Sequence, residues 1–126
     1  MSTQQRASSL GREGGEDGSF QRQAAVFRHA VSADGSTDFP LEAGRYHLYV
    51  ARACPWAHRT LIGRELMGLQ DAIGVSFVSP LRDERGWEFA GREYADAING
   101  FRFLSEAYAI ADPSYDGRAR PRASAR

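Results

Sequence analysis

The chain contains no lysine, and all sixteen of its basic residues are arginine. Sixteen acidic residues balance them, so the net charge does not indicate nucleic acid or another polyanion as a partner. No apolar run approaches the length of about 20 residues that a membrane-spanning helix needs. The amino terminus also lacks the apolar core of a signal peptide. We therefore expect neither a nucleic-acid partner nor a membrane segment.

Cysteine is almost absent as well, since Cys54 is the single thiol of the chain. One cysteine excludes an intrachain disulfide framework. A thiol that must stay reduced fits the cytoplasm better than a secretory compartment, and we expect a cytoplasmic protein. With 126 residues, the chain is long enough for one small domain and too short for two.

Composition divides the chain into three parts. Residues 1–19 are rich in Gly, Ser, Gln and charge, and with so few apolar side chains we expect a flexible leader. Residues 20–118 carry the pattern of an α/β domain that starts with an irregular arm as far as Pro40. Residues 119–126 contain only Ala, Arg, Pro and Ser. We expect them to be an unstructured tail that supplies no strand.

The period of the apolar residues changes at Cys54. Before it, residues 45–50 alternate between apolar and polar, which predicts a strand. After it, the spacing becomes helical, with Pro55 suited to the first position and Gly68 to the stop. The apolar positions of this helix are Ala57, Leu61, Ile62, Leu66 and Leu69. Residues 73–78 predict a second strand, and the order strand, helix, strand predicts a βαβ unit with parallel strands.

The second half of the domain is less regular. Residues 79–97 are mostly polar, with Trp87 and Phe89 as isolated anchors, and they predict a loop over the edge of the sheet. Apolar residues recur at helical spacing over 101–110, and Asp112-Pro113 ends that helix.

Cys54 lies where the first strand passes into the first helix. The unpaired N–H groups and the dipole at a helix amino terminus favour an anion, and therefore the nucleophilic thiolate. Arg52 and Arg59 add positive potential nearby. The opposing interpretation is that a single cysteine serves as a small buried apolar residue. Ala57 stands where a C-x-x-C pair would have its second thiol, so a mixed disulfide on Cys54 needs an external thiol such as glutathione for its release.

Three segments together resemble a known family. They are YHLYVARACPWAHRTLIGRELMGLQDAIGVSFVSPL, GWEF and NGFRFLSEAYAIADPSYDGR. They resemble the N-terminal part of the glutathionyl-hydroquinone reductases, the Xi-class branch of the glutathione transferase superfamily. The resemblance covers about residues 18–118.

The resemblance implies a fold and a reaction. The fold would be α/β, the N-terminal βαβ portion of a thioredoxin-like glutathione transferase domain, here truncated. By resemblance, Cys54 attacks the sulfur of a glutathionyl-hydroquinone, the hydroquinone leaves, and a second glutathione reduces the mixed disulfide. Glutathione is then a co-substrate, quinone-type aromatic molecules are the other partners, and no metal is required. Full-length relatives are expected to be homodimers.

The resemblance also assigns glutathione-binding residues, each with a simpler interpretation. Trp87 would contact glutathione, or would anchor its loop. Arg118 would lie beside glutathione, or would be a solvated charge. Trp56 would wall the thiol pocket, or would only pack. His58 lies one turn after Cys54, but two ligands are too few for zinc, so we expect a half-buried helix histidine.

Other functions remain open. One is a general thioltransferase similar to the omega-class transferases, and another is an inactive truncated fragment or binding module. Nucleic-acid binding through the arginines of the tail lacks the interleaved aromatic residues that stack on bases. By resemblance, the family continues after Gly117-Arg118 with an apolar strand that contains a cis-proline and then with a glutamate-serine pair, and neither the apolar strand nor the pair follows here. We expect a frameshift or a truncated gene, and a marginal domain with an exposed sheet edge.

Overall fold

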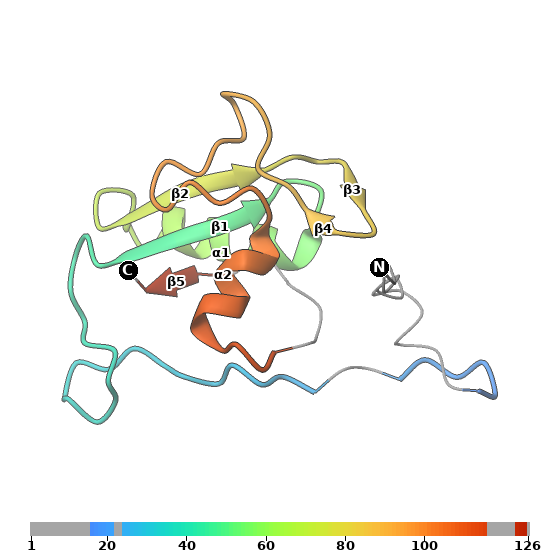
Figure 1. Cartoon of the computed structure of the whole chain (residues 1–126). Helices are drawn as coiled ribbons and strands as arrows, with labels where there is room; N and C mark the ends of the chain where they lie inside the picture. The colour runs from blue at the N-terminus through green and yellow to red at the C-terminus, as the bar shows by residue number, and fades with distance from the viewer. Residues whose placement is uncertain (1–15, 22–23, 116–122, 126) are drawn as a thin grey trace.

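The structure is a computed structural model that describes residues 16–21, 24–115 and 123–125. Strand β1 (Tyr46–Ala51) leads into helix α1 (Pro55–Leu66) and strand β2 (Ile73–Val78). A small hairpin follows, formed by β3 (Arg82–Asp83) and β4 (Gly86–Trp87), and then helix α2 (Leu104–Ala111) and strand β5 (Ala123–Ala125). The main sheet has the order β2-β1-β5 (Figure 1).

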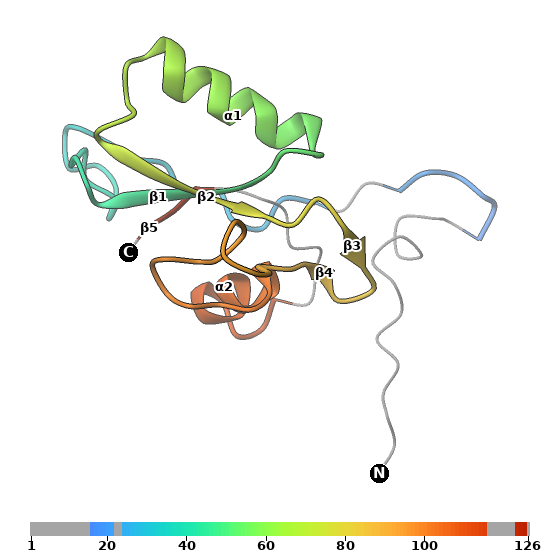
Figure 2. The same ribbon diagram turned by 90° about the horizontal axis from the view of Figure 1, so that it is seen from above.

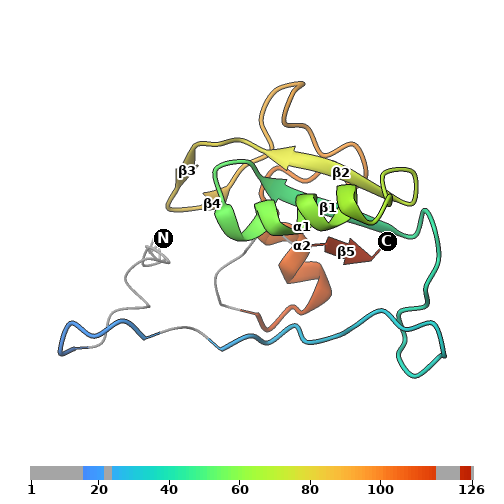
Figure 3. The same ribbon diagram turned by 180° about the vertical axis from the view of Figure 1, so that it is seen from behind.

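The two faces of the main sheet are covered by different helices. Figure 2 shows α1 on one side of the sheet and α2 on the other, and Figure 3 shows α1 from behind, lying across β1 and β2. Strands β1 and β2 are parallel, with Tyr46 opposite Ile73 and Ala51 opposite Val78. The predicted βαβ unit is thereby confirmed: β2 lies at the expected residues, and β1 lies one residue later than expected.

All six residues of β1 are buried. Leu48 and Val50 pack with Ala57 of α1, whereas Tyr49 and Ala51 pack in a second cluster on the α2 side. The other members of that second cluster, which we call the α2-side cluster, are Val78, Trp87, Phe89 and Leu104. The alternation of β1 therefore does not separate a core face from a solvent face, because both faces meet a helical layer.

Helix α1 begins and ends where the sequence indicates. Pro55 is its first residue, and Gly68 follows its end with a φ of 65°, a conformation that glycine adopts without strain. Its inward face differs from the expected stripe, since Ala57 is buried while Ile62 and Leu66 are 48% and 81% exposed. Four apolar side chains lie exposed along α1 and its end, namely Trp56, Ile62, Leu66 and Met67.

Helix α2 has a cap that its sequence supplies. The carboxylate of Glu106 accepts hydrogen bonds from the N–H groups of Arg102 (2.8 Å) and Phe103 (2.6 Å), two donors that the helix leaves without an internal partner. Asp112 closes the other end, where its N–H donates to the carbonyl of Tyr108. The predicted second helix is confirmed, and it begins three residues later than the apolar spacing indicates.

Two segments depart from the expectations. Residues 79–97 contain the β3–β4 hairpin, and Trp87 and Phe89 are 9% and 7% exposed, so they belong to the core rather than to a loop at the edge. Residues 123–125 form β5, which pairs antiparallel with β1, so the expectation that the tail supplies no strand is wrong for these three residues. A strand at a sheet edge needs backbone hydrogen bonds more than apolar side chains, which explains how the sequence Ala-Ser-Ala can form this strand.

A buried polar network joins β1 to the loop before α2. The hydroxyl of Tyr49 donates to Asp96 at 2.9 Å, and the N–H groups of Ile98, Asn99 and Phe101 also donate to this carboxylate. Burial raises the pKa of Asp96, but these hydrogen bonds outweigh burial and hold it below the usual 3.8. Asp96 thereby fixes the loop that returns the chain to the α2 side of the sheet.

In the described part of the chain, no helix has the length and apolar character that crossing a membrane would require.

Gly74 of β2 lies against the ring of His47, and this contact predicts an intolerance to side chains. A Cβ atom at residue 74 would lie 2.7 Å from Nδ1 of His47, whose Nε2 is 2.8 Å from the hydroxyl of buried Ser76. Gly74→Ala should therefore lower the free energy of unfolding by about 1–3 kcal/mol in urea denaturation. Gly63→Ala is the matched control, because a Cβ there meets nothing within 4 Å. Equal midpoints for both variants would contradict the contact.

Asp96 predicts a pH-dependent contribution to stability. Asp96→Asn loses an acceptor for two of the N–H groups, so it should cost about 1–3 kcal/mol near neutral pH. Because the folded pKa is lower than the unfolded one, the contribution of the carboxylate is complete above about pH 4 and is lost as the pH falls through the folded pKa. The gap between the unfolding midpoints of wild type and Asp96→Asn should shrink in acid. A gap that stays constant down to pH 2, or an equal gap for exposed Asp71→Asn, would refute this account.

Candidate functional site

Cys54 occupies the N-cap position of α1, directly after the turn that ends β1. Its N–H donates to the carbonyl of Ala51 at 3.0 Å, and its carbonyl accepts the N–H of His58 at 3.1 Å. Its backbone is extended, and its side chain makes no capping hydrogen bond. The thiol is therefore held beside the first turn of a helix without being used to cap it.

The Cys54 side chain is half-buried and touches both layers of the core. It packs against the cluster of Leu48, Val50 and Ala57 on the α1 side and against the α2-side cluster. The parallel arrangement of β1 and β2 produces this position, because both strands end at the same edge of the sheet. The Cys54 residue is thus fixed by packing on both sides and remains partly exposed.

Trp87 lies in the same α2-side cluster against which Cys54 packs. It is 9% exposed, and the guanidinium of Arg82 lies over its ring at 5.6 Å from the centroid. This burial supports the interpretation of Trp87 as an anchor of its segment. Contact with glutathione stays a prediction.

Trp56 differs from Trp87 in its surroundings. It is 61% exposed on α1, and the guanidinium of Arg59 lies 5.7 Å from the centre of its ring. Arg118, the third glutathione contact that the resemblance implies, lies outside the described residues. The structure therefore brings Cys54 and Trp87 into one cluster and leaves Trp56 on the outer surface of the helix.

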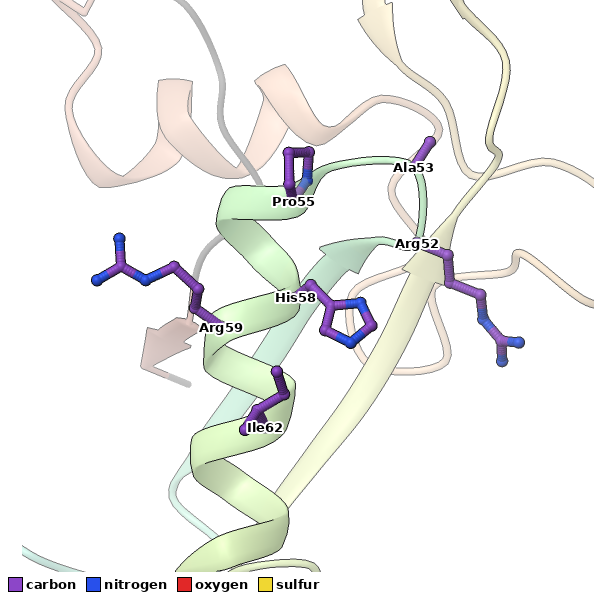
Figure 4. Close-up of a pocket in the computed structure, with 6 residues that line it drawn as sticks. All are labelled: Arg52, Ala53, Pro55, His58, Arg59 and Ile62. Atoms are coloured by element: carbon purple, nitrogen blue, oxygen red, sulfur yellow. The ribbon is translucent and has the colours of Figure 1, made fainter.

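A pocket of about 390 Å³ lies beside the start of α1. Its lining is shown in Figure 4 and consists of Arg52, Ala53, Pro55, His58, Arg59 and Ile62. The two arginines point to opposite sides of His58, and the guanidinium of Arg52 lies 4.1 Å from the ring centre of Phe77. Neither Cys54 nor Trp56 belongs to this lining, so the expectation that Trp56 walls the thiol pocket stays a prediction.

His58 is exposed and lines this pocket. The expectation of a half-buried histidine is wrong, because α1 turns Ala57 and Leu61 rather than His58 and Ile62 toward the sheet. Among the residues that the structure describes, no group of three or more His, Cys, Asp or Glu side chains is placed to hold a metal ion.

Sequence reasoning missed the polar support behind the site. Tyr49 accepts a hydrogen bond from the side-chain amide of Asn99 at 2.9 Å while it donates to Asp96. Tyr49 and Trp87 belong to one cluster, so this network supports the layer on which the thiol rests. The signal that could have found it is the sequence Asp-Ala-Ile-Asn-Gly, in which an aspartate is placed to accept N–H groups two and three residues later.

The different burial of the two tryptophans predicts their response to a quencher. Trp56→Phe should remove most of the emission that acrylamide quenches, because Trp56 is 61% exposed and Trp87 is 9% exposed. Trp87→Phe should leave a protein whose emission is quenched more strongly than that of the wild type. If the Trp56→Phe protein were quenched as strongly as the wild type, Trp87 would not lie in the core.

Sequence comparison finds relatives of known name. No protein-family model matches the chain. It is 47% identical over 110 residues to the glutathionyl-hydroquinone reductase YqjG of Escherichia coli, covering 80% of this chain and 34% of that protein. It is 45% identical to the glutathionyl-hydroquinone reductase PcpF of Sphingobium chlorophenolicum, with 80% and 32% covered. It is also 43% identical to glutathione S-transferase omega-like 2 of Schizosaccharomyces pombe, with 82% and 33% covered.

Solved structures agree with these relatives. The Xi glutathione transferase of Phanerochaete chrysosporium matches with a TM-score of 0.78 at 45% identity, covering 86% of this chain and 35% of that chain. The glutathione-bound structure of YqjG from Escherichia coli matches with a TM-score of 0.70 at 46% identity, with 75% and 33% covered. The fold predicted from the sequence, the βαβ portion of a glutathione transferase N-terminal domain, is confirmed by these matches.

The chain spans about a third of the length of the curated relatives that it matches. Identity above 40% over most of this chain, together with a shared fold, is common ancestry rather than a chance likeness in one motif. By sequence and by fold, the chain is therefore homologous to the N-terminal part of the glutathionyl-hydroquinone reductases and the Xi-class glutathione transferases.

Proposed function

We propose that this chain carries the thiol-bearing part of a glutathione-dependent enzyme that releases hydroquinones from glutathionyl-hydroquinones. The observation that carries this proposal is the position of Cys54, a half-exposed thiol at the first turn of α1 with no capping hydrogen bond of its own. The names of YqjG and PcpF support the substrate, and the glutathione-bound structure of YqjG supports glutathione as the co-substrate.

The proposed reaction has two steps at one sulfur. The Cys54 thiolate attacks the sulfur of the glutathionyl group, and a disulfide forms as the bond from that sulfur to the aromatic carbon breaks. The aromatic carbon takes the electron pair and a proton, and the hydroquinone leaves. A second glutathione thiolate then attacks the mixed disulfide, which gives glutathione disulfide and restores the thiolate. The substrate is reduced, and the two glutathiones are together oxidised to the disulfide.

The chain has no second cysteine that could release the mixed disulfide on Cys54. Ala57, which stands where a second thiol would be, is buried, and Cys54 is the only cysteine of the sequence. Release by external glutathione is therefore the step that such a thiol requires. We propose Trp87, Trp56 and Arg118 as the glutathione contacts. Aromatic quinone-type molecules are the proposed second substrates, and homodimer formation is proposed for the longer protein.

A general thioltransferase is the second candidate. The name of the Schizosaccharomyces pombe relative, an omega-like transferase, supports it. Both candidates use the same mixed disulfide and differ in the group that leaves. An assay of a glutathionyl-hydroquinone beside a simple mixed disulfide separates them, because a thioltransferase turns over only the second substrate.

Cys54→Ser should abolish the glutathione adduct. When the chain is incubated with glutathione disulfide, mass spectrometry should find one glutathione on the peptide that contains Cys54, and none on the Cys54→Ser protein. Leu66→Ala is the control, since this side chain is 81% exposed at the far end of the same helix, and its adduct should equal that of the wild type. A folded wild-type chain that takes up no glutathione would remove the basis of the proposal.

A further inference from the structure

Among the described residues, two contacts that lie apart along the amino-terminal arm join it to the rest of the molecule. Near its start, the ring of Phe27 lies 5.3 Å from that of Tyr108 and 5.1 Å from that of Tyr115, measured between centroids. Near its end, the carbonyl of Pro40 accepts a hydrogen bond of 2.6 Å from the hydroxyl of Tyr46. Figure 1 shows the arm running between these points beneath the sheet and α2. The arm thus joins the start of β1 to the end of α2.

The three rings at the first contact form a closed group, which we call the aromatic clamp: Phe27, Tyr108 and Tyr115. Tyr108 and Tyr115 stack at 5.2 Å with an interplanar angle of 26°. Phe27 meets both of them edge-on, at angles of 83° and 63°. Edge-on and stacked pairs at such distances are favourable arrangements, so all three contacts contribute. The arm supplies one ring, α2 the second, and the segment after α2 the third.

Helix α2 needs contacts of this kind to stay in place. It has eight residues, and a helix of that length is stable in water only through its packing. Its inward side supplies Leu104 to the α2-side cluster, and Ala107 and Tyr108 pack against the same cluster. Tyr108 is therefore a member of the aromatic clamp and also packs against the layer that supports Cys54.

We propose that Phe27 is a positioning residue, and that the arm is a strap whose aromatic clamp holds α2 against the layer on which Cys54 and Trp87 rest. When the aromatic clamp is removed, α2 loses the contacts that hold its outer side. The packing of α2 against the α2-side cluster, which supports Cys54, then becomes looser. The effect on glutathione chemistry rests on the function proposed above, whereas the effect on α2 does not. Phe27, which is distant from Cys54 in the sequence, would then help to set the reactivity of the thiol.

Amide hydrogen exchange, measured on the whole chain, tests whether the aromatic clamp holds α2 in place. In Phe27→Ala, the amide of Asp112, which donates to Tyr108, and the amides of α2 should exchange about tenfold faster, because two ring contacts are lost. Phe27→Tyr keeps the ring and should restore slow exchange. Val26→Ala is the matched control, since Val26 is the neighbouring arm residue and is 57% exposed. Amides of β1 should be unchanged in all three variants.

Unchanged exchange of α2 in Phe27→Ala would overturn the proposal, and so would an equal acceleration in Val26→Ala. If Phe27→Ala also exposes β1 and so unfolds the whole domain, Phe27→Leu decides the matter, because it keeps apolar volume without a ring. Faster exchange confined to α2 in that variant supports the clamp, and exchange equal to that of the wild type overturns it.

The rate of adduct formation tests the link to the site. In Phe27→Ala, the rate at which Cys54 takes glutathione from its disulfide should change at least threefold, and Phe27→Tyr should restore it. Faster exchange of the α2 amides together with an unchanged rate of adduct formation on Cys54 would overturn the positioning role of Phe27. A wild-type chain without any adduct would instead refute the proposed function, and the exchange of α2 would still decide whether the clamp exists.

Discussion

The burial of β1 on both faces is the constraint on which the rest of this structure depends. All six of its residues are buried, with α1 over one face and the α2-side cluster over the other. In the described chain β1 is also paired with β2 along its whole length and with β5 along its first three residues, so the elements around the thiol are placed by their relation to this strand. Cys54 lies just beyond its carboxyl end, where α1 begins, and touches both layers because the strand itself separates them.

This placement explains how a small domain gives one thiol a defined environment. The turn after Ala51 holds the backbone of Cys54 through hydrogen bonds on both sides, and the first turn of α1 supplies N–H groups that favour an anion. The α2 side supplies the support, because Trp87 and Tyr49 pack in one cluster behind the thiol and Asp96 ties that cluster to the following loop. The geometry at the thiol is local, but the supporting residues outside β1, such as Trp87 and Asp96, lie about 30–50 positions away along the chain.

The parts of the fold that could be predicted from the sequence are those with a strong local period. The alternation before Cys54, the helical spacing after it and the second apolar run gave β1, α1 and β2 at the right residues. The prediction for the inward face of α1 was wrong, since small Ala57 faces the sheet while larger Ile62 is exposed. The spacing of apolar residues alone does not tell which side of this helix packs on the sheet. Trp87 and Phe89 entered the core because the chain folds back there, and no local pattern encodes such a return. Strand β5 was missed because Ala-Ser-Ala carries no apolar signal, and its pairing is provided by the backbone edge of β1.

At the site, the thiol was found from its place at a strand-to-helix junction, whereas the support from Asp96 and Asn99 depends on contacts distant in sequence.

The central claim is that the fold, and not merely the presence of a thiol, makes Cys54 a site for glutathione. The most direct test compares the rate at which Cys54 forms a mixed disulfide with glutathione disulfide in the folded chain and in the same chain unfolded in urea, at one pH and one temperature. The account predicts a faster reaction in the folded chain, because only there does the sulfur lie at the first turn of α1. A rate in urea equal to or greater than that of the folded chain would contradict it.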